Sequence, residues 1–191
     1  MKPMRQGHET GQFGSRLAAL IRANSAYRGW HVYYDHGDPA LDTAVAATKG
    51  FFGTEVKNLS RLADIDILIA SPDGIAHVLI EIEERPCAPK KILGDTLAVL
   101  LCNQFAVRVG GEQRTFGVSP DTRLIVAGVL PDRGHRLRKI EDVIGPRLQQ
   151  LQGLPDGISP KNVQLIFSGT ITATIKKLEA LVASWLPSGA A

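Results

Sequence analysis

The stretch from Leu62 to Arg85 constrains the fold most, because its sequence, LADIDILIASPDGIAHVLIEIEER, has the pattern of a β-hairpin. Two runs rich in Ile, Leu and Val flank the segment 71–74, SPDG, as expected for two strands joined by a tight turn. Pro at the second turn position and Gly at the fourth favour a type I turn. The sequence therefore predicts two antiparallel strands near the middle of the chain.

The expected turn also predicts the register of this hairpin. If the first and last turn residues pair, counting outward places Asp64 opposite Glu81 and Asp66 opposite Leu79. Side chains alternate between the two faces of a strand. One face is then apolar and carries Ala63, Ile65, Ile67, Ile69, Ala76, Val78, Ile80 and Ile82. The other face is mixed and carries Leu62, Asp64, Asp66, Leu68, His77, Leu79, Glu81 and Glu83.

Four carboxylates are expected to converge near one end of the mixed face. Like charges directly opposite each other destabilise a sheet, so this arrangement needs a partner. Mg²⁺, for which Mn²⁺ can substitute, takes oxygen ligands and is often held by two or three carboxylates. The pattern therefore predicts a divalent-cation site, and the simpler alternative is a solvated acidic strand end.

Length and composition are those of an ordinary soluble globular protein. The 191 residues suit one domain, 1–191, in which we expect 1–14 to be flexible. The net charge of +3 permits nucleic-acid binding without requiring it. Cys87 and Cys102 lack metal-ligand spacing, so we expect free thiols in a reducing compartment. Because no apolar run could span a bilayer, no membrane partner and a cytoplasmic location are expected.

Hydrophobic periodicity predicts the order of the other elements. A helix is expected from a capping Ser15 to about Tyr27, followed by a strand from Trp30 to Asp35. The remaining expected elements are a short helix at 41–49, a buried helix at 91–105, a hairpin at Gly110-Gly111, a strand at 123–130, a helix opened by the basic run 133–139, a strand at 163–167 and a helix at 171–185. This order predicts an α/β fold whose mixed sheet, an antiparallel meander plus parallel strands, is flanked by helices.

The order helix, β-meander, helix, strand resembles the restriction-endonuclease-like PD-(D/E)xK nuclease superfamily over roughly residues 15–130. In that superfamily the second core strand carries a metal-binding Asp and the third carries a (D/E)-x-K motif. The segment 63–66, Ala-Asp-Ile-Asp, would stand for the Asp strand, with Ala63 where a Pro is usual. The segment 81–83, Glu-Ile-Glu, resembles the E-x-E variant of some type II restriction enzymes, in which Glu replaces the Lys.

The residue types in this pattern assign chemical roles. Asp64 and Glu81, face to face, are the expected metal-bridging pair, and Asp66 is close enough to substitute. Glu83 would orient or deprotonate the attacking water. The resemblance adds the backbone carbonyl of Ile82 as a further metal ligand.

The resemblance also raises the question of further charged groups. The family often uses an additional Glu on the first helix, for which Glu9 and Glu55 are the candidates here. Lys90 and Lys91 open the expected buried helix and could contact phosphate or replace the missing motif Lys. The alternative for both lysines is a solvated helix start.

Basic residues farther along the chain are candidates for nucleic-acid contacts. Arg136 and Arg138 belong to the run 133–139 and could follow a phosphate backbone, although a solvated basic helix face explains them equally well. The other basic residues of that run are Arg133, His135 and Lys139. Arg108 and Arg114 beside the expected Gly-Gly hairpin could enter a DNA groove.

The sequence thus favours a Mg²⁺-dependent nuclease that hydrolyses phosphodiester bonds, with double-stranded DNA as its expected partner and a homodimer left open. The alternative is a non-catalytic restriction-endonuclease-like protein that acts as a binding or assembly module. Its carboxylates would hold a structural cation or none. A third interpretation is an unrelated α/β protein with an acidic hairpin.

Overall fold

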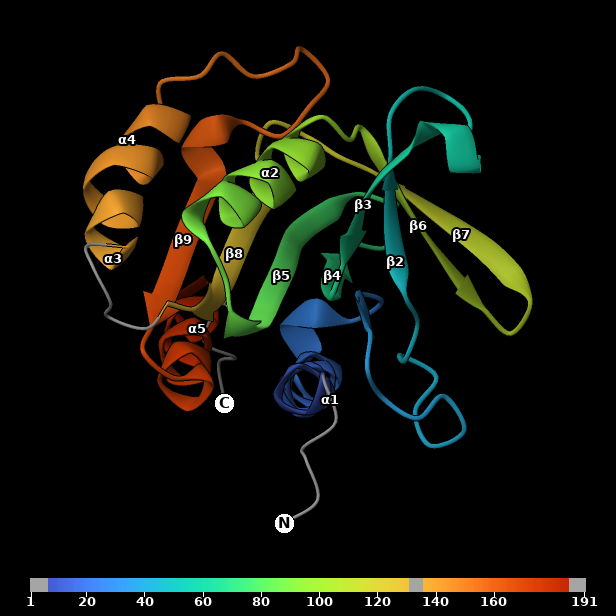
Figure 1. The fold of residues 1–191 in the computed structure, drawn as a ribbon. Helices are drawn as coiled ribbons and strands as arrows, with labels where there is room; N and C mark the ends of the chain where they lie inside the picture. The colour runs from blue at the N-terminus through green and yellow to red at the C-terminus, as the bar shows by residue number, and fades with distance from the viewer. Residues whose placement is uncertain (1–6, 131–135, 186–191) are drawn as a thin grey trace.

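The computed structural model describes residues 7–130 and 136–185, and in these residues the strands form two sheets (Figure 1). The main sheet has five strands in the order β1 (His31–Tyr34), β4 (Ile67–Ala70), β5 (Ala76–Pro86), β8 (Arg123–Val129) and β9 (Val163–Ser168). The second sheet has four strands in the order β3 (Arg61–Ile65), β2 (Thr48–Phe51), β6 (Gln104–Val109) and β7 (Glu112–Gly117). The predicted hairpin at Gly110-Gly111 is confirmed, because β6 and β7 pair antiparallel across these two glycines of positive φ.

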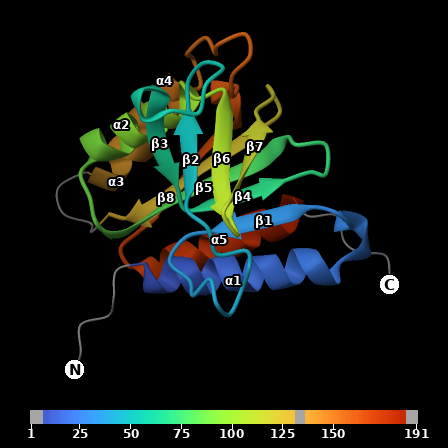
Figure 2. The same ribbon diagram turned by 90° about the vertical axis from the view of Figure 1, so that its right-hand side faces the viewer.

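Helices cover both faces of the main sheet. On one face, α1 (His8–Ala23) and α5 (Ile171–Trp185) lie side by side, as Figure 2 shows, and an ion pair between Arg16 and Glu179 joins them. On the other face lie α2 (Pro89–Leu100) and a helical segment made of α3 (Arg136–Arg138), a π-helical turn (Lys139–Ile144) and α4 (Gly145–Leu148). Strands β1, β4 and β5 are antiparallel, whereas β5, β8 and β9 are parallel. The predicted α/β fold, a mixed sheet flanked by helices, is confirmed.

The main sheet separates two hydrophobic cores. In β4, Ile67 and Ile69 pack toward α1 and α5, whereas Leu68 and Ala70 pack toward α2 and the second sheet. All four side chains are at most 1% exposed, so both faces of this strand are buried. Burial of each large aliphatic side chain contributes roughly 1.5–3 kcal/mol. These cores therefore hold the strands on which the polar residues described below are carried.

The predicted hairpin forms only in part, because its first strand is divided. Residues before Asp66 belong to β3 in the second sheet, and residues after it belong to β4 in the main sheet. The Asp66 carbonyl accepts a hydrogen bond from the Asp35 amide at 2.8 Å, outside the β4–β5 ladder. Asp66 is therefore a corner at which the chain passes from one sheet to the other.

The predicted register is wrong for the same region. Leu68, and not Asp66, lies opposite Leu79, because the turn is longer than expected and a bulge follows Ile69. Asp64 does not face Glu81 on a shared hairpin, since its partner in the second sheet is Lys49 of β2.

Helix α1 begins at His8 and not at Ser15, so the expectation of a flexible stretch through residue 14 is wrong for the described residues 8–14. The N-terminal cap comes from Glu84 at the end of β5. Its carboxylate accepts hydrogen bonds from the amide of Gly7 at 2.9 Å and from the amide and hydroxyl of Thr10, each at 2.8 Å. A carboxylate at a helix N-terminus satisfies free amides and complements the helix dipole. This cap lies far along the chain, which explains why local sequence did not indicate it.

Two smaller expectations also change. The short helix expected at 41–49 does not form: the segment runs as loop into β2, and the Asp42 carboxylate accepts the Ala44 amide at 2.9 Å instead. Helix α2 ends at Leu100, and the last residues expected to be helical begin β6. Both cysteines are buried free thiols. Within the described residues, no helix is both long and apolar enough to cross a membrane.

Two helical glycines provide a test of the packing between α1 and the main sheet. A Cβ at Gly14 would lie 2.5 Å from the Tyr34 side chain, whereas a Cβ at Gly94 on α2 would meet no atom within 4 Å. We expect Gly14→Ala to lower the free energy of unfolding by about 1–3 kcal/mol through overpacking. The control, Gly94→Ala, should raise it by about 0.5–1 kcal/mol because Ala favours helix. Urea denaturation measures both values, and equal effects of the two substitutions would contradict the described packing.

Candidate functional site

The Asp66 side chain occupies the corner between the two sheets and is only 13% exposed. One carboxylate oxygen accepts the backbone N–H of Ile82 at 2.7 Å, and the other lies 3.5 Å from the His36 Nε2. Burial raises the pKa of Asp66, and the charge of Asp35 adds to this, whereas His36 and the Ile82 amide lower it. The hydrogen bond with Asp66 in turn raises the pKa of His36.

Glu81 lies on β5, on the face that is covered by α2. Burial raises the pKa of Glu81 well above its usual range, and the charges of Asp66, Asp95 and Glu83 raise it further against the opposing charge of Lys91. Within the described residues, no hydrogen-bond donor or ion-pair partner reaches the Glu81 carboxylate directly. Ionising a half-buried carboxyl group without a direct partner is costly, so the charged form of Glu81 is less stabilised than those of the neighbouring carboxylates.

Lys91, in the first turn of α2, joins two further carboxylates. Its ammonium lies 2.5 Å from a Glu83 oxygen and 2.9 Å from an Asp95 oxygen. Burial alone would lower the pKa of Lys91, but the hydrogen bonds to Glu83 and Asp95 raise it, so the side chain stays charged at neutral pH. We call Asp66, Glu81, Glu83, Asp95 and Lys91 the carboxylate cluster.

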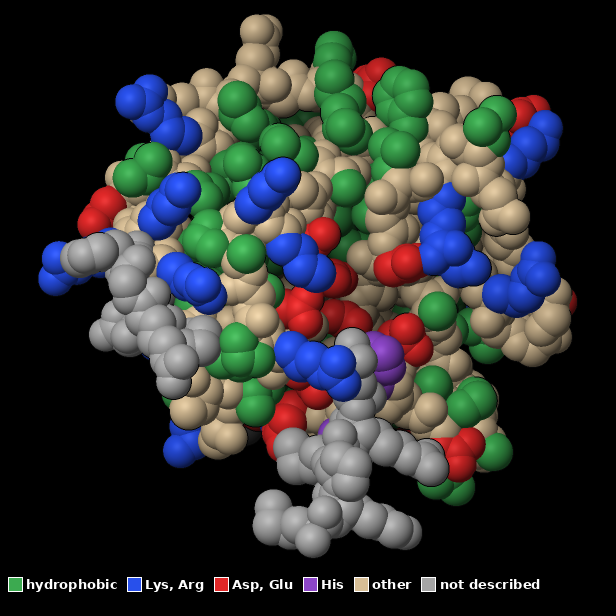
Figure 3. Space-filling view, in the orientation of Figure 1, with side chains coloured by type: hydrophobic (Ala, Val, Ile, Leu, Met, Phe, Trp, Pro, Cys, Tyr) green, Lys and Arg blue, Asp and Glu red, His purple; other side chains and the backbone are tan. Residues whose placement is uncertain are grey.

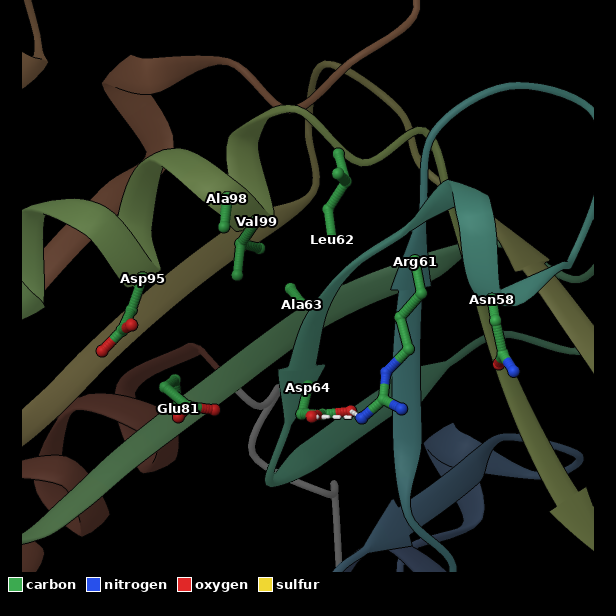
Figure 4. Close-up of a pocket in the computed structure, with 9 residues that line it drawn as sticks. All are labelled: Asn58, Arg61, Leu62, Ala63, Asp64, Glu81, Asp95, Ala98 and Val99. Atoms are coloured by element: carbon green, nitrogen blue, oxygen red, sulfur yellow. Dashed lines mark hydrogen bonds and ion pairs between the residues drawn. The ribbon is translucent and has the colours of Figure 1, made fainter.

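A cavity of about 530 Å³ opens between β3, β5 and α2 beside this cluster. Figure 4 shows Glu81 on one side of it, Asp64 on the other, and Asp95 on the helix above Glu81. Asp64 is 65% exposed and forms an ion pair with Arg61. Asp64 and Glu81 therefore share a cavity, as residues of its opposite walls, although they do not face each other across a hairpin.

The predicted metal ligands fall into two groups. Asp66, Glu81 and Glu83 lie together, and the amide of Ile82 is used to hold Asp66. Asp64 lies apart on the second sheet, with Arg61 as its partner. Among the described residues, no three His, Cys, Asp or Glu side chains are spaced to enclose a metal ion.

The expected lysine and acid candidates can also be placed. Both lysines are exposed, but Lys91 contacts Glu83, whereas Lys90 forms no ion pair in the described part of the chain. Glu9 lies in the first turn of α1, and Glu55 lies in the loop before β3, 2.8 Å from Lys57. Neither Glu contacts the carboxylate cluster through a hydrogen bond or ion pair in the described part of the chain.

The nucleic-acid contacts predicted in the described part of the basic run 133–139 lie outside the cluster, unlike Lys91. Arg136 and Arg138 are exposed on α3, whereas Arg133 and His135 fall outside the described residues. Figure 3 shows acidic side chains gathered in a central hollow, with Lys and Arg side chains on the surface on either side. The charged side chains of the hollow are therefore mainly acidic, and those on the surface around it are mainly basic (Figure 3).

Sequence analysis did not identify Asp95, His36 or Glu84 as parts of this region. Asp95 follows Lys91 by four residues, a spacing that pairs charges along one helix face and could have indicated it. No local pattern points to His36, which is held in a left-handed conformation with φ of 65° after β1. Glu84, the residue after Glu83, caps α1 and has no local pattern that indicates this role.

The donor set has the chemistry that a hard divalent cation requires. Asp66 and Glu81 both supply carboxylate oxygens, the charge of Asp66 raises the pKa of Glu81, and Glu81 has no direct partner among the described residues that a cation would have to displace. Lys91 already neutralises Glu83, which leaves Asp66 and Glu81 as the pair that would hold the ion.

No model of a protein family matches the chain, and no curated protein or solved structure is significantly similar to it.

The raised pKa of Glu81 predicts how stability depends on pH. A carboxyl group with a raised folded-state pKa contributes stability below its unfolded pKa, and this contribution is lost as pH rises through the folded pKa. Glu81→Gln keeps the shape and removes the charge. We therefore expect it to raise the melting temperature near neutral pH, with a gain that shrinks toward pH 4.

The matched control is Asp64→Asn, on the opposite wall of the same cavity, which removes a carboxylate that Arg61 already pairs. It should give no pH-dependent gain. Melting curves of the wild type and both variants between pH 4 and 8 measure the effect, and a Glu81→Gln variant that is destabilised at pH 8 would refute the assignment.

Proposed function

We propose that this protein is a metal-dependent nuclease that hydrolyses phosphodiester bonds, with DNA as its substrate and Mg²⁺ as its cation. The observation that carries the proposal is the convergence of Asp66, Glu81, Glu83 and Lys91 beside one cavity. The corner before β4, strand β5 and helix α2 supply these groups. The resemblance to PD-(D/E)xK nucleases was based on the same order of elements, a meander followed by a helix and a strand. Membership of that superfamily is part of the proposal.

The proposed roles differ from the sequence-based expectation in one residue. Asp66 takes the place of Asp64 as the partner of Glu81 in holding the cation, because it is buried and oriented by the Ile82 amide. A bound divalent cation would supply positive charge to the scissile phosphate and acidify a water molecule. Glu83 would accept the proton of the attacking water.

Lys91 would replace the lysine that is missing from the motif. Its ammonium is held beside the cluster by Glu83 and Asp95, and its raised pKa keeps it charged. It would therefore act by stabilising the negative charge that develops on the phosphate, and not as a base. The exposed Arg136 and Arg138 would bind the DNA backbone away from the reacting phosphate.

The second candidate is a non-catalytic binding or assembly module of the same fold. The ion pairs of Lys91 with Glu83 and Asp95 favour it, because they give two of the carboxylates a positive partner without any metal ion. Such a module would bind nucleic acid without cutting it. Cleavage assays therefore distinguish the two candidates.

Cleavage of supercoiled plasmid tests the catalytic roles. With Mg²⁺ present, we expect Glu81→Gln and Asp66→Asn to reduce the rate by at least about 10²-fold, because each removes one of the two carboxylates proposed to hold the cation, whose charge is worth several kcal/mol in the transition state. Asp64→Asn should keep most of the activity, because its carboxylate lies on the outer wall with Arg61. If Asp64→Asn lowered the cleavage rate as much as Asp66→Asn, Asp64 would again be the proposed partner of Glu81 in holding the cation.

The neighbouring lysines provide a matched pair in the same assay. Lys91→Ala should lower the rate by about 10²-fold, whereas Lys90→Ala, which removes an equally charged side chain without an ion pair to Glu83, should change it by less than about threefold. Wild-type protein that binds plasmid but leaves it intact with Mg²⁺ and with Mn²⁺ would favour the non-catalytic module.

Salt-dependent binding tests the basic surface. The double substitution Arg136→Ala and Arg138→Ala should weaken binding to DNA of any sequence and reduce the slope of log affinity against log salt by about 2, because two phosphate contacts are lost. The control is Lys176→Ala on α5, across the main sheet from α2, which should leave the slope unchanged. Fluorescence anisotropy over a salt series gives both slopes, and an unchanged double variant would show that α3 does not contact DNA.

A further inference from the structure

A second cavity, of about 350 Å³, lies near the ends of β5 and β8 that are farthest from the carboxylate cluster. Its walls come from the segment before β1, from β5, β8 and the end of α5. The side chains that give it its character are Tyr27, Trp30, His77, Asp121, Arg123 and Trp185. His77 precedes Glu81 by four positions on β5, so the cavity is about 13 Å from the cluster along the strand.

The walls of this cavity are unusually rich in π-systems. The ring centroids of Trp30 and His77 lie 4.7 Å apart, with an angle of 37° between the ring planes. The Tyr27 ring packs edge-on against Trp30, with 5.2 Å between the centroids. Across the cavity, the Arg123 guanidinium lies 4.4 Å from the centre of the Trp185 ring. Both indoles are half-buried and both line the cavity, so a flat ring entering it would meet Trp30 and the guanidinium that covers Trp185.

The polar groups around this cavity restrict what it can bind. Arg123 supplies hydrogen-bond donors and Asp121 supplies acceptors, and both side chains belong to exposed residues. Tyr27 is 6% exposed, and its hydroxyl has no hydrogen-bond partner in the described part of the chain. The guanidinium over Trp185 disfavours a cationic ligand, because it already takes the aromatic face that would attract one and repels like charge.

We propose that this cavity binds a planar nitrogen heterocycle of nucleobase size. The ring would stack against Trp30 and against the Arg123 guanidinium that covers Trp185, and its N–H groups would donate to the Asp121 carboxylate. The volume lies at the lower end of the range for small-molecule sites, which suits a single base or nucleotide. This site is separate from the carboxylate cluster, so binding does not require cleavage.

Intrinsic fluorescence offers a direct test, because Trp30 and Trp185 are the two tryptophans of the chain. With excitation at a wavelength absorbed by indole and not by the bases, AMP and CMP are titrated separately into the full-length protein without divalent metal. A saturable change in emission with at least one nucleotide is expected. Ribose 5-phosphate, which has the phosphate and sugar but no base, should produce no saturable change.

Two arginine variants locate the site. Arg123→Ala should weaken nucleotide binding by about tenfold, because it removes the donors and the stacked guanidinium beside Trp185. Arg108→Ala removes an exposed arginine from β6 in the second sheet and should leave the affinity within about twofold. Circular dichroism confirms that each variant is folded.

Three outcomes would overturn the proposal: no saturable response to either nucleotide, an equal response to ribose 5-phosphate, or equal loss of affinity in both arginine variants. Each is independent of plasmid cleavage. A protein that cuts DNA but gives any of these results would retain the nuclease proposal and lose the base-binding site.

Discussion

The hydrogen bond between the Asp66 carboxylate and the Ile82 amide is the interaction on which the arrangement of this molecule depends. Asp66 stands where the chain leaves the second sheet and enters the main one, so it fixes how β3 and β4 diverge. The same contact sets the carboxylate beside Glu81, the preceding residue of β5. A buried carboxylate needs such donors, because desolvation without them costs several kcal/mol. The fold therefore supports this charge at the point where the two sheets meet.

Charge balance around this point is incomplete, and that imbalance gives the cluster its chemical character. Lys91 offsets Glu83 and Asp95, and His36 offsets Asp66, but Glu81 has no direct partner among the described residues. Raised pKa values at a cleft are typical of sites that bind a cation or move protons, and they lower stability when the site is empty. The cavity beside Glu81 gives a ligand access to that uncompensated charge.

Much of the fold could be predicted because its strongest patterns are local. The uninterrupted apolar run of β8 and the apolar stripe of α5 are properties of short segments, and both elements formed close to the expected bounds. The two glycines between β6 and β7 indicated their hairpin for the same reason. Residue types also placed Glu81 and Glu83 in the candidate site. The resemblance suggested Lys90 or Lys91 as the missing motif Lys, and of these two Lys91 contacts Glu83.

The sequence by itself determined the alternation that buries both faces of the central strands, and hence a mixed sheet between helices. Only the tertiary structure decided which aspartate joins Glu81, because Asp66 is selected by the distant Ile82 amide and by His36, while Asp64 pairs with Arg61. The start of α1 was decided in the same way, by a carboxylate 77 residues away. Periodicity acts between neighbours along the chain, whereas burial, capping and ion pairing depend on which distant residues the fold brings together.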